Sequence, residues 1–188
     1  MSTASQARLS VIPESTPNPN STKFVVNRTL LSGAGRDFPN REAAQDSLLA
    51  RELFLLPGVS GVYIGSNFVT VTAAGNVWAL PPLVIQAIET HVNSGIPAVG
   101  TETVSAPIPR KPDSPLEAGI LRILENEIRP AVAMDGGDIT FAGYENGVLK
   151  VHLRGACHSC PSSTVTLKNG IETRLRQEFP EILRVEAV

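Results

Sequence analysis

The chain has 188 residues, of which 42% are hydrophobic and 18% are charged, a composition typical of one large folded domain or two small ones. Sixteen basic and eighteen acidic side chains give a formal net charge of -2, so the positive excess of a protein that binds nucleic-acid phosphates is missing. The most apolar run, residues 77–88, contains two prolines and is shorter than the roughly 20 residues that a membrane-spanning helix requires. We therefore expect no nucleic-acid partner and no membrane span.

The N-terminus has no feature of a targeting segment. Residues 1–8 contain a single arginine and no apolar core, so we expect neither a secretory signal nor a transit peptide. This favours a reducing compartment, either the bacterial cytoplasm or the mitochondrial matrix if the chain is a mature eukaryotic form. In such a compartment a close pair of cysteines, here Cys157 and Cys160, is typical of a metal or redox site.

The first half of the chain predicts a small mixed domain. Residues 1–21 are polar and rich in proline, serine and asparagine, and predict a flexible N-terminus. In residues 22–95, β-branched and aromatic runs indicate strands, and leucines on one helical face indicate helices, the first of them capped by Ser47. The expected elements are strands at 23–27, 59–64 and 68–72, the last two as a hairpin, and helices at 47–56 and 81–92.

A change in composition marks the domain boundary. Residues 96–113 are rich in proline, with glycine, serine and threonine, and predict a semi-rigid linker. The second domain, residues 114–188, opens with Ser114-Pro115-Leu116-Glu117, in which a cap serine, an N1 proline and a glutamate form a capping box. We expect a helix from this point to about Ile128, which Pro130 ends or kinks.

The rest of the second domain predicts a hairpin, a helix and a strand. Asn146-Gly147 is a two-residue hairpin turn, and pairing across it places Arg154 opposite Ile139. The turn at residues 135–137, Asp-Gly-Gly, then lies beside Cys157 and forms part of the wall of the cysteine site; alternatively, its glycines serve only the entry to the hairpin. The expected elements are strands at 138–144, 148–154 and 182–188, the last with Leu183, Val185 and Ala187 on one face, and a helix at 161–179.

Cys157 and Cys160 stand at the junction between a strand and a helix, and their spacing places both sulfurs on one side of the chain. The helix N-terminus and the amides of Gly155 and Ala156 are expected to favour thiolates. Three kinds of site then remain open. Two chains could share an iron–sulfur cluster, the same four sulfurs could hold zinc, or one pair could act as a thioredoxin-like dithiol.

The surroundings of the pair bear on these alternatives. The 28 residues after Cys160, 161–188, are too few for the remainder of a thioredoxin-like fold. A zinc site closed within one chain would need His152 and His158 as further ligands. His152 is predicted on the polar face of its strand, where solvent is the expected neighbour, and His158 lies between the two cysteines.

The segment 155–163, Gly-Ala-Cys-His-Ser-Cys-Pro-Ser-Ser, with the Asp-Gly-Gly-Asp of residues 135–138 and the helix residues 166–172, resembles the C-terminal domain of NifU-like (Nfu) iron–sulfur proteins. The resemblance covers residues 114–188. The N-terminal half is similar to the N-terminal domain of the same family in residues 16–21, 23–24, 53–54, 57–59, 68–71 and Trp78. Many relatives have a glycine inside the cysteine pair, where this chain has His158-Ser159.

The resemblance implies an α/β (α+β) protein of two small domains, the C-terminal one built as helix–hairpin–helix–strand. It implies a carrier or scaffold that binds a [4Fe-4S] cluster between two subunits through Cys157 and Cys160 and transfers it to apo-proteins. The expected partners are a second copy of the chain, an upstream cluster donor and apo iron–sulfur clients, which the N-terminal domain is expected to recognise. Since no nucleophile–base pair or carboxylate dyad is evident, we predict a non-enzyme. The alternatives are a zinc-bridged structural dimer and a thiol–disulfide redox protein.

Overall fold

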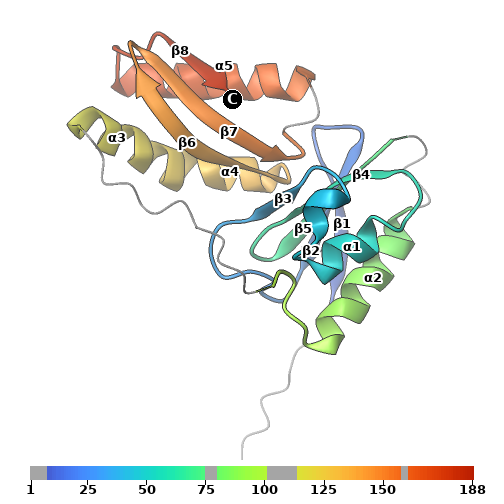
Figure 1. Cartoon of the computed structure of the whole chain (residues 1–188). Coiled ribbons are helices and arrows are strands. Elements are labelled where there is room, and N and C mark those ends of the chain that lie inside the picture. Colours follow the sequence, from blue (N-terminus) through green and yellow to red (C-terminus); the bar gives the residue numbers. More distant parts are fainter. Residues whose placement is uncertain (1–7, 75–79, 101–113, 158–160) are drawn as a thin grey trace, which may run out of the picture.

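The computed structural model of the chain describes residues 8–74, 80–100, 114–157 and 161–188, with side chains from residue 165 onward in the last range (Figure 1). The chain forms two units, each with a β-sheet, covering helices and its own cluster of buried hydrophobic side chains. The first unit comprises the described residues up to 100, and the second comprises those from 114 onward. The predicted α+β fold is confirmed.

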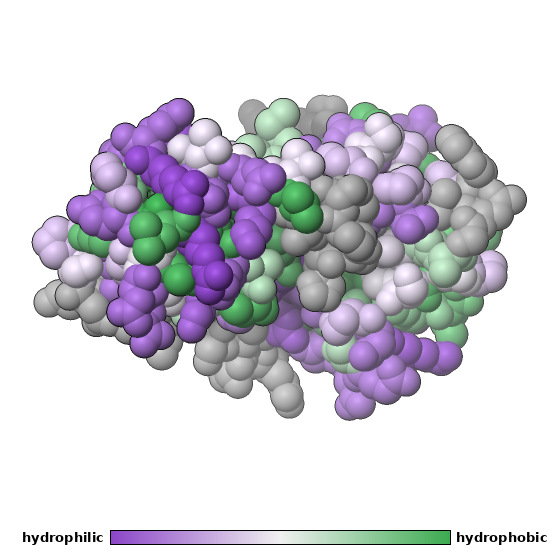
Figure 2. All heavy atoms as spheres, turned by 90° about the horizontal axis from the view of Figure 1, so that it is seen from above, coloured by the Kyte–Doolittle hydropathy of each residue, from purple (hydrophilic) through white to green (hydrophobic). Residues whose placement is uncertain are grey.

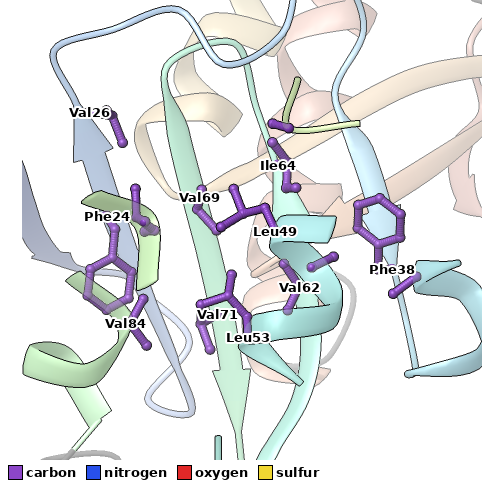
Figure 3. Close-up of a cluster of buried hydrophobic side chains, with 14 of the residues drawn as sticks. Phe24, Val26, Phe38, Leu49, Leu53, Val62, Ile64, Val69, Val71 and Val84 are labelled. Atoms are coloured by element: carbon purple, nitrogen blue, oxygen red, sulfur yellow. The ribbon is translucent and has the colours of Figure 1, made fainter. Parts of the chain in front are cut away.

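The first unit is a five-stranded antiparallel sheet with strand order β1-β2-β5-β4-β3. Helices α1 and α2 cover one of its faces, and alternate strand residues such as Phe24, Val62 and Val69 point into the core beneath them (Figure 3). The elements are β1 (Val11–Ser15), β2 (Ser21–Val26), β3 (Arg36–Phe38), η1 (Glu42–Ala44), α1 (Leu48–Leu53), β4 (Val59–Ile64), β5 (Phe68–Ala73) and α2 (Leu80–Ser94).

Most of the elements expected in the first half are present. Ser47 caps α1 by accepting a hydrogen bond from the amide of Ala50, and β4 pairs with β5 as the expected hairpin. The prediction of a flexible N-terminus over residues 1–21 is wrong for residues 11–15, which form β1 and pair with β2. Pro13 is tolerated there because β1 is an edge strand, where the missing amide need not serve the sheet.

The predicted linker begins too early. Ala98 and Val99 are buried in the core of the first unit. The hydroxyl of Ser47 donates to the carbonyl of Ala98 at 2.6 Å, and the amide of Gly100 donates to the carbonyl of Asp46 at 2.6 Å. Residues 96–100 therefore belong to the first unit, and the remainder of the predicted linker, 101–113, lies outside the described residues.

The second unit is a three-stranded sheet of order β6-β7-β8, in which β6 and β7 are antiparallel and β7 and β8 are parallel. Alternate residues of β7, Leu149, Val151 and Leu153, share a buried cluster with the helices. Among the described residues of both units, no helix is long and apolar enough to cross a membrane. The elements are α3 (Pro115–Ile123), the π-helical turn η3 (Leu124–Ile128), α4 (Arg129–Met134), β6 (Gly137–Glu145), β7 (Val148–Gly155), α5 (Pro161–Glu178) and β8 (Arg184–Ala187).

The helical chain that opens the second unit continues past Pro130 to Met134, so Pro130 does not end the helix, which was one of its two predicted effects. A π-helical turn directly precedes the proline, and the amide of Arg129 donates to the carbonyl of Leu124, five residues back. An interior proline lacks an amide donor and crowds the preceding turn, so regular α spacing is disfavoured there. The π turn is the local departure that accommodates it. The Ser114 cap is confirmed, since its hydroxyl accepts from the amide of Glu117.

The hairpin register differs from the prediction by one residue beyond a bulge. Glu145 pairs with Val148 as expected, but the register shifts between Phe141 and Gly143. Arg154 consequently pairs with Asp138 instead of Ile139. A β-bulge of this kind places two residues of one strand opposite one residue of its partner.

The C-terminal elements follow the expected order. Helix α5 ends at Glu178 and β8 begins at Arg184, so the predicted strand 182–188 starts too early and Leu183 lies before it. Val185 is buried in β8, whereas Leu183 and Ala187 are exposed. The turn before β8 brings Leu183 over Gly147 at the hairpin instead of into the core. On the face of the molecule seen from above, hydrophobic residues are interspersed among hydrophilic ones (Figure 2).

Candidate functional site

Cys157 lies just after β7 and before α5, as the strand–helix junction predicts, and its residue exposure is 5%. Cys160 and His158 lie outside the described residues. A cavity of about 650 Å³ opens beside Cys157 between the two units. Its lining includes Pro17 and Asn18 from the loop between β1 and β2, Ala131 and Asp135 from α4 and its end, and Leu167 and Ile171 from α5.

The glycine turn before β6 forms one wall of this site, as predicted. The amide of Ala156 donates to the carbonyl of Gly136 at 3.2 Å. A Cβ atom added to Gly137 would lie 2.6 Å from the Cys157 Sγ, so only glycine leaves room for the thiol. Gly136 and Gly155 have φ angles of 78° and 66°, a region that L side chains rarely adopt. The glycines therefore shape the site in addition to serving the hairpin.

The thiol of Cys157 is held in its protonated form. Burial raises its pKa to about 11, and the negative charges of Asp135 and Asp138 act in the same direction. The amide of Gly155 donates to Oδ1 of Asp37 at 3.2 Å, and the amide of Ala156 is bonded to a carbonyl, so both amides already serve oxygen atoms. The prediction that these amides and the helix favour a thiolate is wrong, because desolvation of the sulfur is the larger effect.

An ion pair between the buried Asp138 and the half-buried Arg129 lies beside the glycine turn. The carboxylate of Asp138, a residue 3% exposed, accepts from Arg129 Nε at 2.7 Å and from Arg129 Nη2 at 3.1 Å. Burial works against the charge of Arg129, but its hydrogen bonds to Asp138 and Glu125 outweigh that effect and raise its pKa. Burial, together with a hydrogen bond to Asp138, also raises the pKa of Tyr63, which comes from the first unit. Asp138 is therefore a charged acceptor shared by both units.

His152 takes no part in the site. His152 is exposed on β7, as predicted, and its Nδ1 lies 3.0 Å from the carbonyl oxygen of Val188. In the portion of the chain that the structure describes, no three His, Cys, Asp or Glu side chains gather in a way that could hold a metal ion.

Residues of the first unit that border the site had no signal in the sequence. Two segments beside Cys157, residues 136–138 and 155–156, are contacted by four such side chains: Asn18, Asp37, Tyr63 and Thr70. The asparagine lies in the Thr-Pro-Asn-Pro-Asn run that predicts a turn, but a turn pattern does not say what the turn touches. A distant contact of this kind is fixed by the packing of two units.

The structure thus defines a two-unit α+β protein with a cysteine site at the junction between a strand and a helix. Two family models match the chain: "Scaffold protein Nfu/NifU N terminal" over residues 11–95 and "NifU-like domain" over residues 120–186. The second match contains Cys157 and Cys160, and the first contains Asn18, Tyr63 and Thr70.

Characterised relatives match over nearly the whole chain. A human protein named NFU1 iron-sulfur cluster scaffold homolog, mitochondrial, is 42% identical over 178 residues, which cover 93% of this chain and 70% of the relative. A protein of the same name from Drosophila yakuba is 40% identical over 192 residues, covering 100% of this chain and 68% of the relative. The chain therefore belongs to the Nfu family of iron–sulfur cluster scaffold proteins.

Among solved structures, the solution structure of a NifU-like protein from Saccharomyces cerevisiae is similar to part of the chain. It is 22% identical, covers 54% of this chain and 93% of its own, and has a TM-score of 0.47. At this level the likeness adds nothing to the family assignment.

Proposed function

We propose that the chain is an iron–sulfur cluster carrier that holds a [4Fe-4S] cluster between two subunits through Cys157 and Cys160 and passes it to apo-proteins. The observation that supports this most is the place of the cysteine pair: it lies in the NifU-like domain, and Cys157 borders an open cavity at a loop. A cluster with four thiolate ligands needs two more than one chain contains, and a second copy supplies them by symmetry.

The raised pKa of Cys157 suits a carrier. Iron binds a thiolate, so loading removes the proton from a sulfur that the unloaded chain keeps protonated. Protonation of the sulfur after release then opposes rebinding, which favours transfer to a client whose thiols have lower pKa values. A thioredoxin-like dithiol needs an attacking cysteine with a lowered pKa, and Cys157 does not supply one.

The remaining parts of the proposal concern partners and place. The names of the human and Drosophila relatives describe scaffolds, which fits a role without substrate turnover, and they describe mitochondrial proteins, which favours the matrix over the bacterial cytoplasm. We assign clients with vacant cysteine ligands and an upstream donor as the partners. Recognition of these partners falls to the first unit in this proposal.

Anaerobic reconstitution of the full chain tests the proposal directly. About four irons and four sulfides per dimer, with the broad visible absorption of a cluster, are expected, and Cys157→Ser or Cys160→Ser should abolish both cluster and cluster-dependent dimer. His152→Ala is the matched control, since its exposed side chain lies away from the cavity. Zinc without sulfide would establish the zinc-bridged dimer instead, and a colourless monomer would refute any shared site.

A further inference from the structure

The face of the first-unit sheet opposite its helices is buried at its centre. Helices α1 and α2 cover the face that carries Val62 and Val69. The opposite face carries Tyr63 and Thr70, which are only 3% and 1% exposed although no helix of the first unit covers them. What covers them is the second unit, whose β7 contacts both β4 and β5 (Figure 1). The two units therefore meet on this face of the sheet, and their contact buries Tyr63 and Thr70.

The contacts across this face go to the backbone of the glycine turn and of residues 155–156, which lie beside Cys157. Thr70 Oγ1 donates to the carbonyl of Gly136 at 2.7 Å, and Asn18 Nδ2 donates to the carbonyl of Ala156 at 3.0 Å. In the reverse direction, the amide of Gly155 donates to Asp37 Oδ1. Side chains of one unit thus satisfy the main chain of the other at the glycine turn and at the residue before the cysteine.

The fit depends on the absence of side chains at two positions. A Cβ atom on Gly136 would lie 2.9 Å from Thr70 Oγ1 and 3.1 Å from Thr16 Cγ2. A Cβ atom on Gly155 would lie 3.1 Å from Tyr63 Cγ. These glycines therefore permit the close approach of the first unit in addition to their own turns.

A charged contact completes the interface. Tyr63 is hydrogen-bonded to Asp138, which is itself paired with Arg129 inside the second unit. Without the first unit, this face of the carboxylate would be hydrated. A buried carboxylate requires that its hydrogen bonds be satisfied, so the tyrosine hydroxyl favours the docked arrangement.

We propose that the first unit docks on the glycine turn and on residues 155–156, and that Asn18 and Thr70 are positioning residues that hold the main chain at Ala156 and Gly136 beside Cys157. The first unit then also supplies part of the wall of the cluster cavity, through Pro17 and Asn18. The docking itself needs no cluster; its effect on cluster lifetime rests on the function proposed above. While the first unit is docked, the main chain at residues 155–156 holds Cys157 in place, and undocking makes the position of Cys157 less fixed.

Three variants of the chain separate this role from a general effect on folding. Thr70→Val removes the hydroxyl that bonds to Gly136 but keeps a β-branched shape suited to a strand. Thr70→Ser keeps the hydroxyl and should restore the contact. Thr72→Val is the matched control, two residues along the same strand, where the hydroxyl bonds to Ser21 within the first unit.

The measurement is amide hydrogen exchange of the metal-free chain, read at Gly155 and Ala156. Both amides are hydrogen-bonded in the docked state. We expect exchange there to be about tenfold faster in Thr70→Val, and unchanged in Thr70→Ser and Thr72→Val. Asn18→Asp should have a similar effect to Thr70→Val, because it keeps the acceptor for the amide of Asn20 but loses the donor to Ala156. If Asn18→Asp fails to fold, the threonine series decides.

Cluster lifetime after reconstitution is the second readout, expected to shorten in Thr70→Val and not in Thr72→Val. Exchange at Gly155 and Ala156 that is equal in wild type and Thr70→Val would overturn the docking proposal, whether or not a cluster binds. Faster exchange in Thr70→Val in a chain that never binds a cluster would support docking and refute the carrier function. If Thr72→Val speeds amide exchange or shortens cluster lifetime as much as Thr70→Val does, the cause is a general loss of sheet stability, and the positioning role is overturned.

Discussion

The protonated thiol of Cys157 makes the stability of the metal-free chain depend on alkaline pH. The pKa of this thiol is about 11 in the folded chain, against an ordinary value of 9.0. Below pH 9 the folded and unfolded thiols are both protonated, and the stabilising effect is fully present. Above pH 9 the unfolded thiol loses its proton first, so the free energy of unfolding falls as pH rises toward 11.

The size of the fall follows from the pKa difference. One pKa unit corresponds to about 1.4 kcal/mol, so between pH 8 and pH 10.5 the thiol should cost the folded chain about 2 kcal/mol of stability. Other groups titrate in the same range, and the comparison with Cys157→Ala removes them, since its constant loss of packing does not vary with pH. The quantity of interest is how the stability difference between the two chains changes with pH.

Urea unfolding at a series of pH values, under reductant and chelator, measures this difference. The wild-type chain should lose about 2 kcal/mol relative to Cys157→Ala across the range. Parallel pH profiles would show that the thiol has an ordinary pKa in the folded chain. A wild-type chain that gains stability relative to the variant would show a thiolate at neutral pH, and our account of the site would be wrong.

Other substitutions test the packing and charge around the cysteine. Gly137→Ala should lower the free energy of unfolding by about 1–3 kcal/mol, because its Cβ would overlap the Cys157 sulfur. Gly143→Ala is the control and should change it much less, since no atom lies within 4 Å of the added Cβ. Equal effects of the two variants in thermal unfolding would contradict the steric account. Asp138→Asn should cost about 1.5–3 kcal/mol, as urea titration can measure, because Arg129 would keep only Glu125 as a charged partner. By contrast, the exposed pair formed by Arg184 should contribute at most about 1 kcal/mol, so a loss of similar size in Arg184→Gln would argue against the importance of burial.

Features set by neighbours in the sequence were predicted well. Ser47 and Ser114 cap helices, and the Asn146-Gly147 turn fixes the first pairs of the hairpin and so brings the glycine turn to Cys157. Each of these depends on a few adjacent residues whose backbone preferences agree. The sequence leaves open whether Pro130 ends or kinks its helix, because the π turn that accommodates the proline has no simple sequence signal.

Features set by contact between distant segments were not predicted. The pKa of Cys157 depends on how deeply the sulfur is buried, which no local pattern of charges and helix ends reveals. Asn18 bonds to Ala156 and Thr70 bonds to Gly136 across separations of 138 and 66 residues. Their residue types are ordinary for a turn and a strand, so the sequence alone gives no reason to connect them with the cysteines.

The bulge between Phe141 and Gly143 has a consequence for the whole site. In a regular strand Phe141 and Tyr144 would lie on opposite faces of the sheet, yet both pack against the core of the second unit. The extra residue reverses the alternation, so that Gly137 faces the Cys157 sulfur while Asp138 faces Tyr63. The one extra residue in β6 therefore determines which face of the strand leaves room for the thiol and which face contacts the first unit.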